Sequence, residues 1–400
     1  MTSSLIGLMP HTLSLSSFLL SILGKPKNKN VMTARNRRNL WKNLWNKPVE
    51  WSPVLQSSGR SRTEEFTWLV ASRQAMGTFF ELRMASHTLG ALALAERSFD
   101  LVDELEIQMT IYRDDSTIAR LNESYHNQPI SLEPKLYELL KLARTIHSST
   151  GGAYDITTGA LSRAWGFVQG PKRVPSDLEL KSAMARTGLR HLIFNDLDRS
   201  IQSTDPGIEI NLGSIGKGYA IDRVADLFKN HPFPAPALIQ GGRSSLYALG
   251  HQPGTLFEPW SIALHNPLDP NQPLIQIKLQ DQALGTSGGT FQSFEQNGRS
   301  YGHIIDPRSG IPAPGPLSVT VIAPTAAEAD ALSTAFYLTG PKIAQQIIDQ
   351  NPSLSAIFLT ANPSTQPPAP ELLLLNITPE KVVIGNLHST FIQPGQPLPQ

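Results

Sequence analysis

The spacing of apolar residues predicts an ordered series of strands and helices that begins near residue 66. Residues 68–86 alternate apolar and polar side chains, as a pair of neighbouring strands does. Residues 91–109 and 133–150 instead repeat their apolar side chains at helical spacing, and a pair of glycines is placed to end the second helix. The first part of the chain is therefore expected to combine antiparallel strands with helices.

The later part of the pattern is richer in strands. Ser176 followed by Glu179 is typical of a capping box at the start of a helix, and a glycine-rich turn opens another helix over residues 214–230. Short apolar runs, each expected to be a strand, follow at residues 237–240, 244–250, 260–264, 274–280, 301–306 and 317–323. Because strands and helices mix without strict βαβ alternation, we predict an α+β fold with mostly antiparallel sheets and packed helices.

Composition shifts divide the chain into three parts. Residues 1–62 form a basic extension, residues 63–360 the folded body, and residues 361–400 a proline-rich segment. Within the last part, the apolar residues of 372–385 predict a peripheral strand pair. Four hundred residues suffice for a large buried core.

The chain contains no cysteine, which excludes disulfides, thiolate metal sites and thiol nucleophiles. It also argues against a lipoprotein, since an N-terminal cysteine would carry the lipid. The compartment stays open, and the cytoplasm and the periplasmic face of an inner membrane are both compatible with a chain without cysteine.

The net charge of +1 hides an uneven distribution. Residues 1–60 carry a net charge of +8, which leaves −7 for the rest of the chain. The basic residues follow the apolar stretch 5–23, so the segment can be interpreted as a leader that associates with anionic lipid. Alternatively, it is a flexible tail or an over-extended start, with translation beginning at Met32. We favour this alternative over the membrane-associated leader. A nucleic-acid surface is disfavoured because the body is acidic.

The helix after residue 325 carries two oxygen-bearing side chains that a buried helix does not need. Thr325 and Glu328 have the spacing of a capping box, which sets the register. In that register Asp330 and Thr334 lie one turn apart on the same face. A carboxylate and a hydroxyl so placed are suitable ligands for Mg²⁺. Alternatively, Asp330 is solvated and Thr334 bonds back to a carbonyl of its own helix.

A glycine-rich turn precedes the helix over 214–230. It begins with Asn211 and places Lys217 where the helix starts. Free main-chain N–H groups at a helix start form a favourable anion site, to which Lys217 would add a positive charge. The glycine spacing fits neither the Walker nor the Rossmann pattern, so an ordinary tight helix start is equally compatible.

Two further segments carry candidate chemistry. Ser287 satisfies the G-x-S-x-G pattern, but no helix is predicted after it, so we interpret it as a loop residue near the site and not as a nucleophile. His303 is predicted on an alternating strand, with Ile305 on the same side, followed by a tight turn from Asp306 to Gly310. Beside a phosphate site such a histidine is a candidate acid, base or hydrogen-bond donor.

Earlier elements supply candidates for contacts to a flat aromatic ring. They are Met76, Tyr112 and the group Ala153, Tyr154 and Asp155, of which Asp155 is expected on an exposed loop.

Taken together, eight segments in order resemble the ApbE family of FAD:protein FMN transferases. They are MGTFFEL, YRDDSTIARLN, TGGAYDITTGAL, NLGSIGKGYAID, ALIQGG, ALGTSGG, GHIIDPRSGIP and ADALSTAFYLTG, spread over roughly residues 70–345. The resemblance implies an α+β catalytic domain that binds FAD in a cleft. With Mg²⁺ it would transfer the FMN half of FAD to a Thr or Ser hydroxyl of an acceptor protein, such as a subunit of a redox complex, and release AMP.

The resemblance also implies roles for individual residues. The contacts to FAD fall on Met76, Tyr112, Ala153, Tyr154, Asp155, Asn211, Lys217 and His303. The metal ligands fall on Asp330, Thr334 and the main-chain carbonyl of Ser214. Lys217 and the Mg²⁺ held by Asp330 would offset the charge that develops as AMP leaves, and His303 is the candidate base for the acceptor hydroxyl.

The chain departs from the family pattern at two positions. Asn211 stands where Asp is frequent, which removes a negative charge near the ion. Arg243 follows the paired glycines of GGRSS, where an acidic residue is more usual. The sequence leaves two alternatives open: a pyrophosphatase that splits FAD into FMN and AMP, and a flavin-binding protein without activity.

Overall fold

The structure, a computed structural model, describes residues 50–55, 67–267, 273–289, 292–362, 364, 369–385 and 387–398. Its centre is a ten-stranded sheet in which all neighbours are antiparallel except the last pair. In spatial order the strands are β1 (Glu50–Leu55), β2 (Thr67–Ala75), β3 (Thr78–Ala85), β7 (Ala237–Gly241), β8 (Ser245–Leu249), β11 (Gln282–Ser287), β16 (Ser318–Ala323), β17 (Ser355–Asn362), β18 (Ala369–Leu375) and β20 (His388–Ile392).

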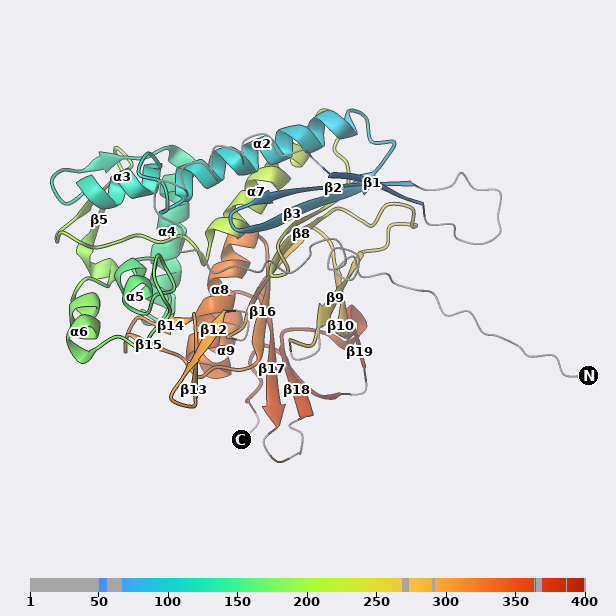
Figure 1. The fold of residues 1–400 in the computed structure, drawn as a ribbon. Coiled ribbons are helices and arrows are strands. Elements are labelled where there is room, and N and C mark those ends of the chain that lie inside the picture. Colours follow the sequence, from blue (N-terminus) through green and yellow to red (C-terminus); the bar gives the residue numbers. More distant parts are fainter. Residues whose placement is uncertain are drawn as a thin grey trace, which may run out of the picture.

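Eight α-helices lie in the described part of the chain. They are α2 (Ala91–Met109), α3 (Thr117–Ser124), α4 (Pro134–Ser149), α5 (Gly159–Ala164), α6 (Asp177–Ala185), α7 (Gly216–Lys229), α8 (Ala326–Thr339) and α9 (Pro341–Gln350). Helices α3 to α6 gather at one side of the molecule, away from β9, β10 and β19 at the other (Figure 1). No helix in the ranges given above combines the length and apolarity needed to cross a bilayer.

Smaller sheets complete the fold. They are β19 (Val382–Ile384) with β10 (Pro273–Leu279) and β9 (Trp260–His265); β4 (Ile130–Ser131) with β6 (Ser200–Ser203) and β5 (Leu192–Asn195); β12 (Ser293–Gln296) with β13 (Arg299–Gly302); and β14 (Ile305–Asp306) with β15 (Ile311–Pro312). Two 3₁₀ turns, η3 and η4, span Leu189–His191 and Pro379–Lys381.

The large sheet is buried on both faces at its centre. All five residues of β8 are buried, and they alternate between two apolar clusters. Tyr247 packs in the cluster that includes residues of α2, α7 and α8, whereas Leu246 packs in the cluster formed with β9 and β10. The period-two pattern therefore builds three layers, with helices on one face of the sheet and a small sheet on the other.

The predicted α+β class is confirmed, and several elements lie where the pattern placed them. Helix α2 covers exactly the predicted residues 91–109, and β2 and β3 form the predicted pair. Helix α6 begins with the predicted capping box, since Ser176 Oγ accepts from Glu179 N and the Glu179 carboxylate accepts from Ser176 N.

Strands form in both the N-terminal and the C-terminal segments. Strand β1 pairs with β2 although residues 50–55 were assigned to the N-terminal extension. The remaining residues of that extension, with its basic cluster, lie outside the described residues. In the C-terminal segment both predicted strands form, but β18 joins the large sheet beside β17 and β19 pairs with β10. The predicted pairing of these strands with one another is wrong, because each finds a partner elsewhere in the chain.

Candidate active site

Helix α8 presents Asp330 to the N-terminus of α7. The Asp330 side chain is only 5 % exposed, and its two oxygens accept hydrogen bonds from Gly218 N at 2.8 Å and Ser245 Oγ at 2.6 Å. Gly218 is the third residue of α7, so its N–H is one that the helix itself leaves without a partner. Asp330 therefore joins α8, the start of α7 and the start of β8.

Two glycines allow these elements to approach so closely. A Cβ added at Gly218 would lie 2.1 Å from the carbonyl oxygen of Ala326, and one added at Gly285 would lie 2.6 Å from the main-chain nitrogen of Asp330. Any side chain at either position would push α8 away from α7 or from β11. Gly218 of the GKG segment and Gly285 of the ALGTSGG segment are thus required by packing around Asp330.

The charge of Asp330 is only partly balanced. Lys217 Nζ lies 3.9 Å from Asp330 Oδ2, beyond hydrogen-bond distance. Burial raises the pKa of the Asp330 carboxyl, while the Lys217 charge and the bonds from Ser245 and Gly218 act in the opposite direction. A buried carboxylate in this situation is a favourable partner for an added cation.

Thr334 lies one turn beyond Asp330, as the register predicts. Its Oγ1 is 3.0 Å from Ser287 Oγ and donates to the Asp330 main-chain oxygen at 3.3 Å. The bond to the Asp330 main-chain oxygen is the one expected if Thr334 bonds back to its own helix. The solvated Asp330 that was expected together with it is wrong, because Asp330 is buried. Ser287 also meets Ser333 Oγ at 2.8 Å.

Ser287 is the last residue of β11, so its assignment to a loop is wrong. The next regular elements among the described residues are the strands β12 and β13, and a nucleophile elbow would need a helix there. The Ser287 hydroxyl is engaged with α8, consistent with a role near the site and not as a nucleophile.

The donor set around Asp330 fits a small hard cation. Asp330, Thr334 and Ser214 offer only oxygen, and no group of three His, Cys, Asp or Glu side chains capable of holding a metal occurs in the described part of the chain. A softer metal would need nitrogen or sulfur ligands, whereas Mg²⁺ binds through one or two carboxylates together with water and substrate phosphate.

The loop after α4 reaches the same region. Tyr154 is 1 % exposed, and its hydroxyl accepts a hydrogen bond from Ser214 Oγ at 3.1 Å. Burial, with smaller contributions from the charges of Asp330 and Asp155, raises the pKa of the Tyr154 hydroxyl, which therefore stays protonated. Ala153 beside it is also buried.

The prediction of an exposed Asp155 is wrong. Its carboxylate is buried and accepts from Thr157 N at 2.7 Å and from Leu189 N at 3.0 Å, and His147 Nδ1 lies 3.3 Å away. The side chain holds its own loop against the residues before β5, so it can support a bound flavin by shaping the loop.

His303 lies in a bend between β13 and β14, not on a continuous strand as predicted. Ile304 and Ile305 are both buried, so the expected alternation is wrong. The His303 ring meets the Phe167 ring edge-on at 6.5 Å, and its Nδ1 is a buried atom with no hydrogen-bond partner in the structure.

Electrostatics keep His303 neutral. Burial is the largest cause that lowers its pKa below the ordinary value of 6.5, and the charges of Lys217 and Lys172 act in the same direction. A neutral imidazole with one unpaired nitrogen can accept a proton, which suits a base.

The predicted turn from Asp306 to Gly310 is confirmed, with Gly310 N bonded to Asp306 O at 2.7 Å.

The other predicted flavin contacts lie on loops. Met76 sits in the β2–β3 turn at a φ of 49°, Tyr112 follows α2 and is 54 % exposed, and the Asn211 side chain accepts from Gly213 N at 2.9 Å. Direct contacts unite Lys217 with Asp330 and Tyr154 with Ser214. Among the described residues, no hydrogen bond or ion pair joins Met76, Tyr112 or Asn211 to those four residues.

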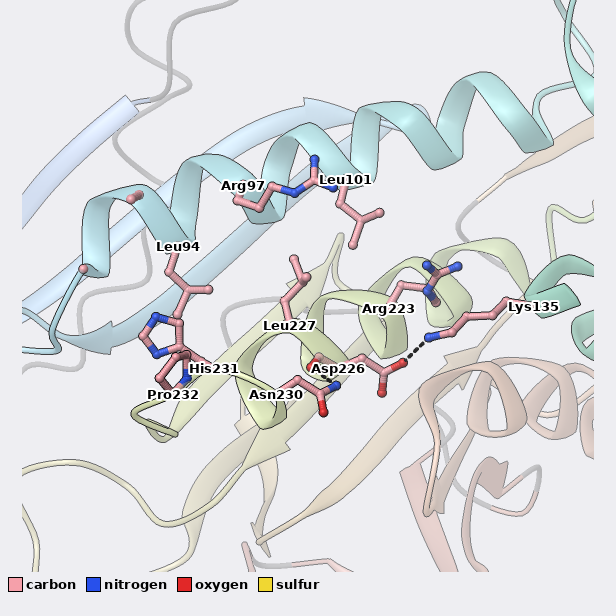
Figure 2. Close-up of a pocket in the computed structure, with 12 residues that line it drawn as sticks. Leu94, Arg97, Leu101, Lys135, Arg223, Asp226, Leu227, Asn230, His231 and Pro232 are labelled. Atoms are coloured by element: carbon pink, nitrogen blue, oxygen red, sulfur yellow. Dashed lines mark hydrogen bonds and ion pairs between the residues drawn. The ribbon is translucent and has the colours of Figure 1, made fainter. Parts of the chain in front are cut away.

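A groove of about 530 Å³ lies elsewhere, between α2 and α7 (Figure 2). Leu94, Leu101 and Leu227 point into it, and Lys135 pairs with Asp226 at 2.8 Å at one end. None of the described residues that line it belongs to the predicted site. The groove borders the far end of α7 and is separate from the contact at Gly218.

Three residues at the site were not assigned a role from the sequence. Ser245 donates a hydrogen bond to Asp330, and the charge of Lys172 lowers the pKa of His303. Asp222 of α7 accepts a hydrogen bond from Ala326 N at 2.7 Å. The sequence held a signal only for Asp222, which lies one turn beyond Gly218 on the predicted helix.

Known proteins share both the sequence pattern and the fold. The profile of the ApbE family matches residues 76–358. An FAD:protein FMN transferase of Escherichia coli K12 is 31 % identical over 292 residues, 70 % of this chain and 80 % of that protein. One from Treponema pallidum is 29 % identical over 316 residues, 75 % of this chain and 86 % of that protein.

Two solved structures are similar as well. The ApbE protein of Thermotoga maritima superposes with a TM-score of 0.67 at 29 % identity and covers 73 % of this chain and 94 % of its own. The flavin transferase ApbE of Vibrio cholerae gives a TM-score of 0.65 at 27 % identity, covering 74 % of this chain and 94 % of its own.

Proposed function

The chain belongs to the ApbE family, and we propose that it is a Mg²⁺-dependent FAD:protein FMN transferase. Its substrates are FAD and an acceptor protein with a Thr or Ser hydroxyl, and its products are the flavinylated protein and AMP. The observation that carries the proposal is the buried Asp330 carboxylate, which Lys217 and two hydrogen bonds balance only in part.

The reaction exchanges one phosphorus–oxygen bond for another. The acceptor oxygen forms a bond to the phosphorus of the FMN half, and the bond from that phosphorus to the bridging oxygen breaks. The hydroxyl proton leaves, and AMP departs with the bridging oxygen and its electron pair. Such a transfer depends mainly on positioning and on neutralising charge.

Residues of this chain supply both requirements. Lys217, together with the positive end of the α7 helix dipole, favours the negatively charged pyrophosphate. Asp330, Thr334 and the Ser214 carbonyl would hold Mg²⁺, which when bound neutralises charge on the phosphate oxygens. His303, kept neutral by its surroundings, takes the proton of the acceptor hydroxyl.

The test is a reaction of the full chain with FAD, Mg²⁺ and an acceptor fragment that contains one Thr. Mass spectrometry of the fragment should show an increase equal to FMN less one water, which is absent when that Thr is replaced by Ala. Free FMN and AMP with an unmodified fragment would instead establish the pyrophosphatase, and unchanged FAD would indicate binding alone.

A further inference from the structure

Helices α7 and α8 cap each other at their N-termini. Asp222, in the second turn of α7, accepts from Ala326 N at 2.7 Å and from Ala327 N at 2.8 Å, the first two residues of α8. In return Asp330, in the second turn of α8, accepts from Gly218 N in the first turn of α7. Each helix thus places a carboxylate on the N-terminus of the other.

These bonds satisfy N–H groups that a helix cannot pair internally. The first four N–H groups of any α-helix lack an internal acceptor, and the N-terminal end of the helix dipole favours a negative charge. At α8, Asp222 binds the first two, and Thr325 Oγ1 accepts from Glu328 N, the third, at 3.3 Å. The two caps of α8 differ in one respect: Thr325 belongs to the chain that enters α8, whereas Asp222 belongs to α7.

Steric contact and the Asp222 bonds act on α8 in opposite directions. The carbonyl of Ala326 lies against Gly218 so closely that even a Cβ there would be 2.1 Å away, which prevents α8 from moving nearer to α7. The two bonds from Asp222 prevent the same end of α8 from moving away. The position of Asp330, one turn along α8, is therefore defined from both sides.

We propose that Asp222 is a positioning residue that fixes the Asp330 carboxylate for metal binding, acting through the first turn of α8. The inference rests on the proposed function, because it takes Asp330 as a metal ligand. Both oxygens of Asp222 are bound to main-chain nitrogens of α8, so its own role would be to hold that helix. Groups that orient a metal ligand typically change metal affinity about 10–100-fold when they are removed.

Metal affinity of the full-length chain with FAD present distinguishes this role from simple stabilisation. Free Mn²⁺, a paramagnetic substitute for Mg²⁺, is counted by electron paramagnetic resonance in the wild type and in Asp222→Ala, Asp222→Asn, Thr325→Ala and Asp330→Ala. All are compared at a temperature at which circular dichroism shows them folded. Thr325→Ala is the matched control, since it removes a cap from the same helix without releasing α8 from α7.

We expect Asp222→Ala to raise the Mn²⁺ Kd about 10–100-fold. Asp222→Asn should have a smaller effect, because its amide oxygen can still accept one of the two N–H groups. Thr325→Ala should lower the melting temperature, as loss of an N-cap costs about 1 kcal/mol, but leave the Kd unchanged. In turnover, Asp222→Ala should lower kcat and leave the KM for the acceptor as it is.

Three results would overturn the inference. Wild-type affinity in both Asp222 variants would mean that the bonds to α8 only stabilise the fold. An equal loss of affinity in Thr325→Ala would mean that any weakening of α8 suffices. Wild-type affinity in Asp330→Ala would refute the proposed metal site itself, and the inference with it, whereas the first two results leave that site intact.

Discussion

The Lys217 ammonium lies 3.9 Å from the Asp330 carboxylate, close enough to attract it but too far to donate a hydrogen bond. The lysine therefore shares the site with the carboxylate without fully neutralising it. Both charges can act on a third group, with Asp330 attracting a cation and Lys217 attracting a phosphate. The arrangement suits a site where a metal and a pyrophosphate bind together.

Removal of the Asp330 carboxylate should abolish transfer. Mg²⁺ contributes several kcal/mol to such reactions, so Asp330→Ala should reduce covalent FMN transfer by about 10³-fold or more. A fluorescence assay of flavin bound to the acceptor measures the rate. Excess chelator should reduce the transfer rate of the wild type to that of Asp330→Ala. It should not reduce the transfer rate of the variant further. A variant that transfers at the normal rate in chelator would disprove the metal site.

Gly218 should tolerate no side chain. In Gly218→Ala the new Cβ would lie 2.1 Å from the Ala326 oxygen, and overpacking of this kind costs about 1–3 kcal/mol. The control is Gly216→Ala in the same turn, where the nearest atoms belong to the Met109 side chain at 3.6 Å. Chemical denaturation should show a lower free energy of unfolding for Gly218→Ala alone. Equal stability of the two variants would contradict the close packing of α7 against α8.

The pH dependence of transfer should report His303. Because its pKa is lowered from 6.5, the rate should fall only when the pH drops below that value. Lys172→Gln removes one of the charges that lower this pKa, so the acid limb of the profile should move to higher pH. Lys181→Gln, on the exposed surface of α6, removes the same charge elsewhere and should leave the limb in place. An acid limb that also survives in His303→Asn would exclude His303 as the base.

Without metal, Asp222 should contribute more to the stability of the fold in mild acid than at neutral pH. Burial raises the pKa of Asp222 from 3.8 to about 7, so between these values the folded chain holds a proton that the unfolded chain has lost. Stability contributed by this group therefore falls as pH rises from about 4 to about 7. Relative to Asp222→Asn, the wild type should therefore lose melting temperature in chelator as the pH rises over this range. Asp226→Asn, one turn along α7, is the control and should keep the wild-type slope.

Local patterns predicted the elements of the fold well, because their causes lie within a few residues. The boundaries of α2 follow from its own apolar spacing, and the start of α6 from Ser176 and Glu179. Pairing between distant segments was not predictable in this way. Strands β18 and β19 were expected to pair because they are neighbours in sequence, but β19 pairs with β10 from a much earlier part of the chain, and β18 pairs with β17 and β20 instead.

At the candidate site, too, features set by local sequence were predictable and contacts between distant residues were not. The register of α8 correctly placed Asp330 and Thr334 on one face. The exposure of Asp155 was misjudged because its partner Leu189 N is 34 residues away, and nothing in the loop itself reveals that bond. His303 was misjudged because the strand is interrupted between β13 and β14. The contacts of Asp222 to α8 span more than 100 residues and become visible only in three dimensions.

These long separations also bear on the order in which the chain folds. The bond between Gly218 and Asp330 joins residues 112 positions apart, and the bond between Ser245 and Asp330 joins residues 85 apart. Closing such loops is entropically costly and slow, so contacts of this kind form late. During synthesis on the ribosome, a nascent chain that has not yet exposed α8 holds the glycines of the α7 turn but lacks the Asp330 carboxylate that binds Gly218 N. Any ligand whose binding requires Asp330 is therefore expected to bind only after α8 has been synthesised.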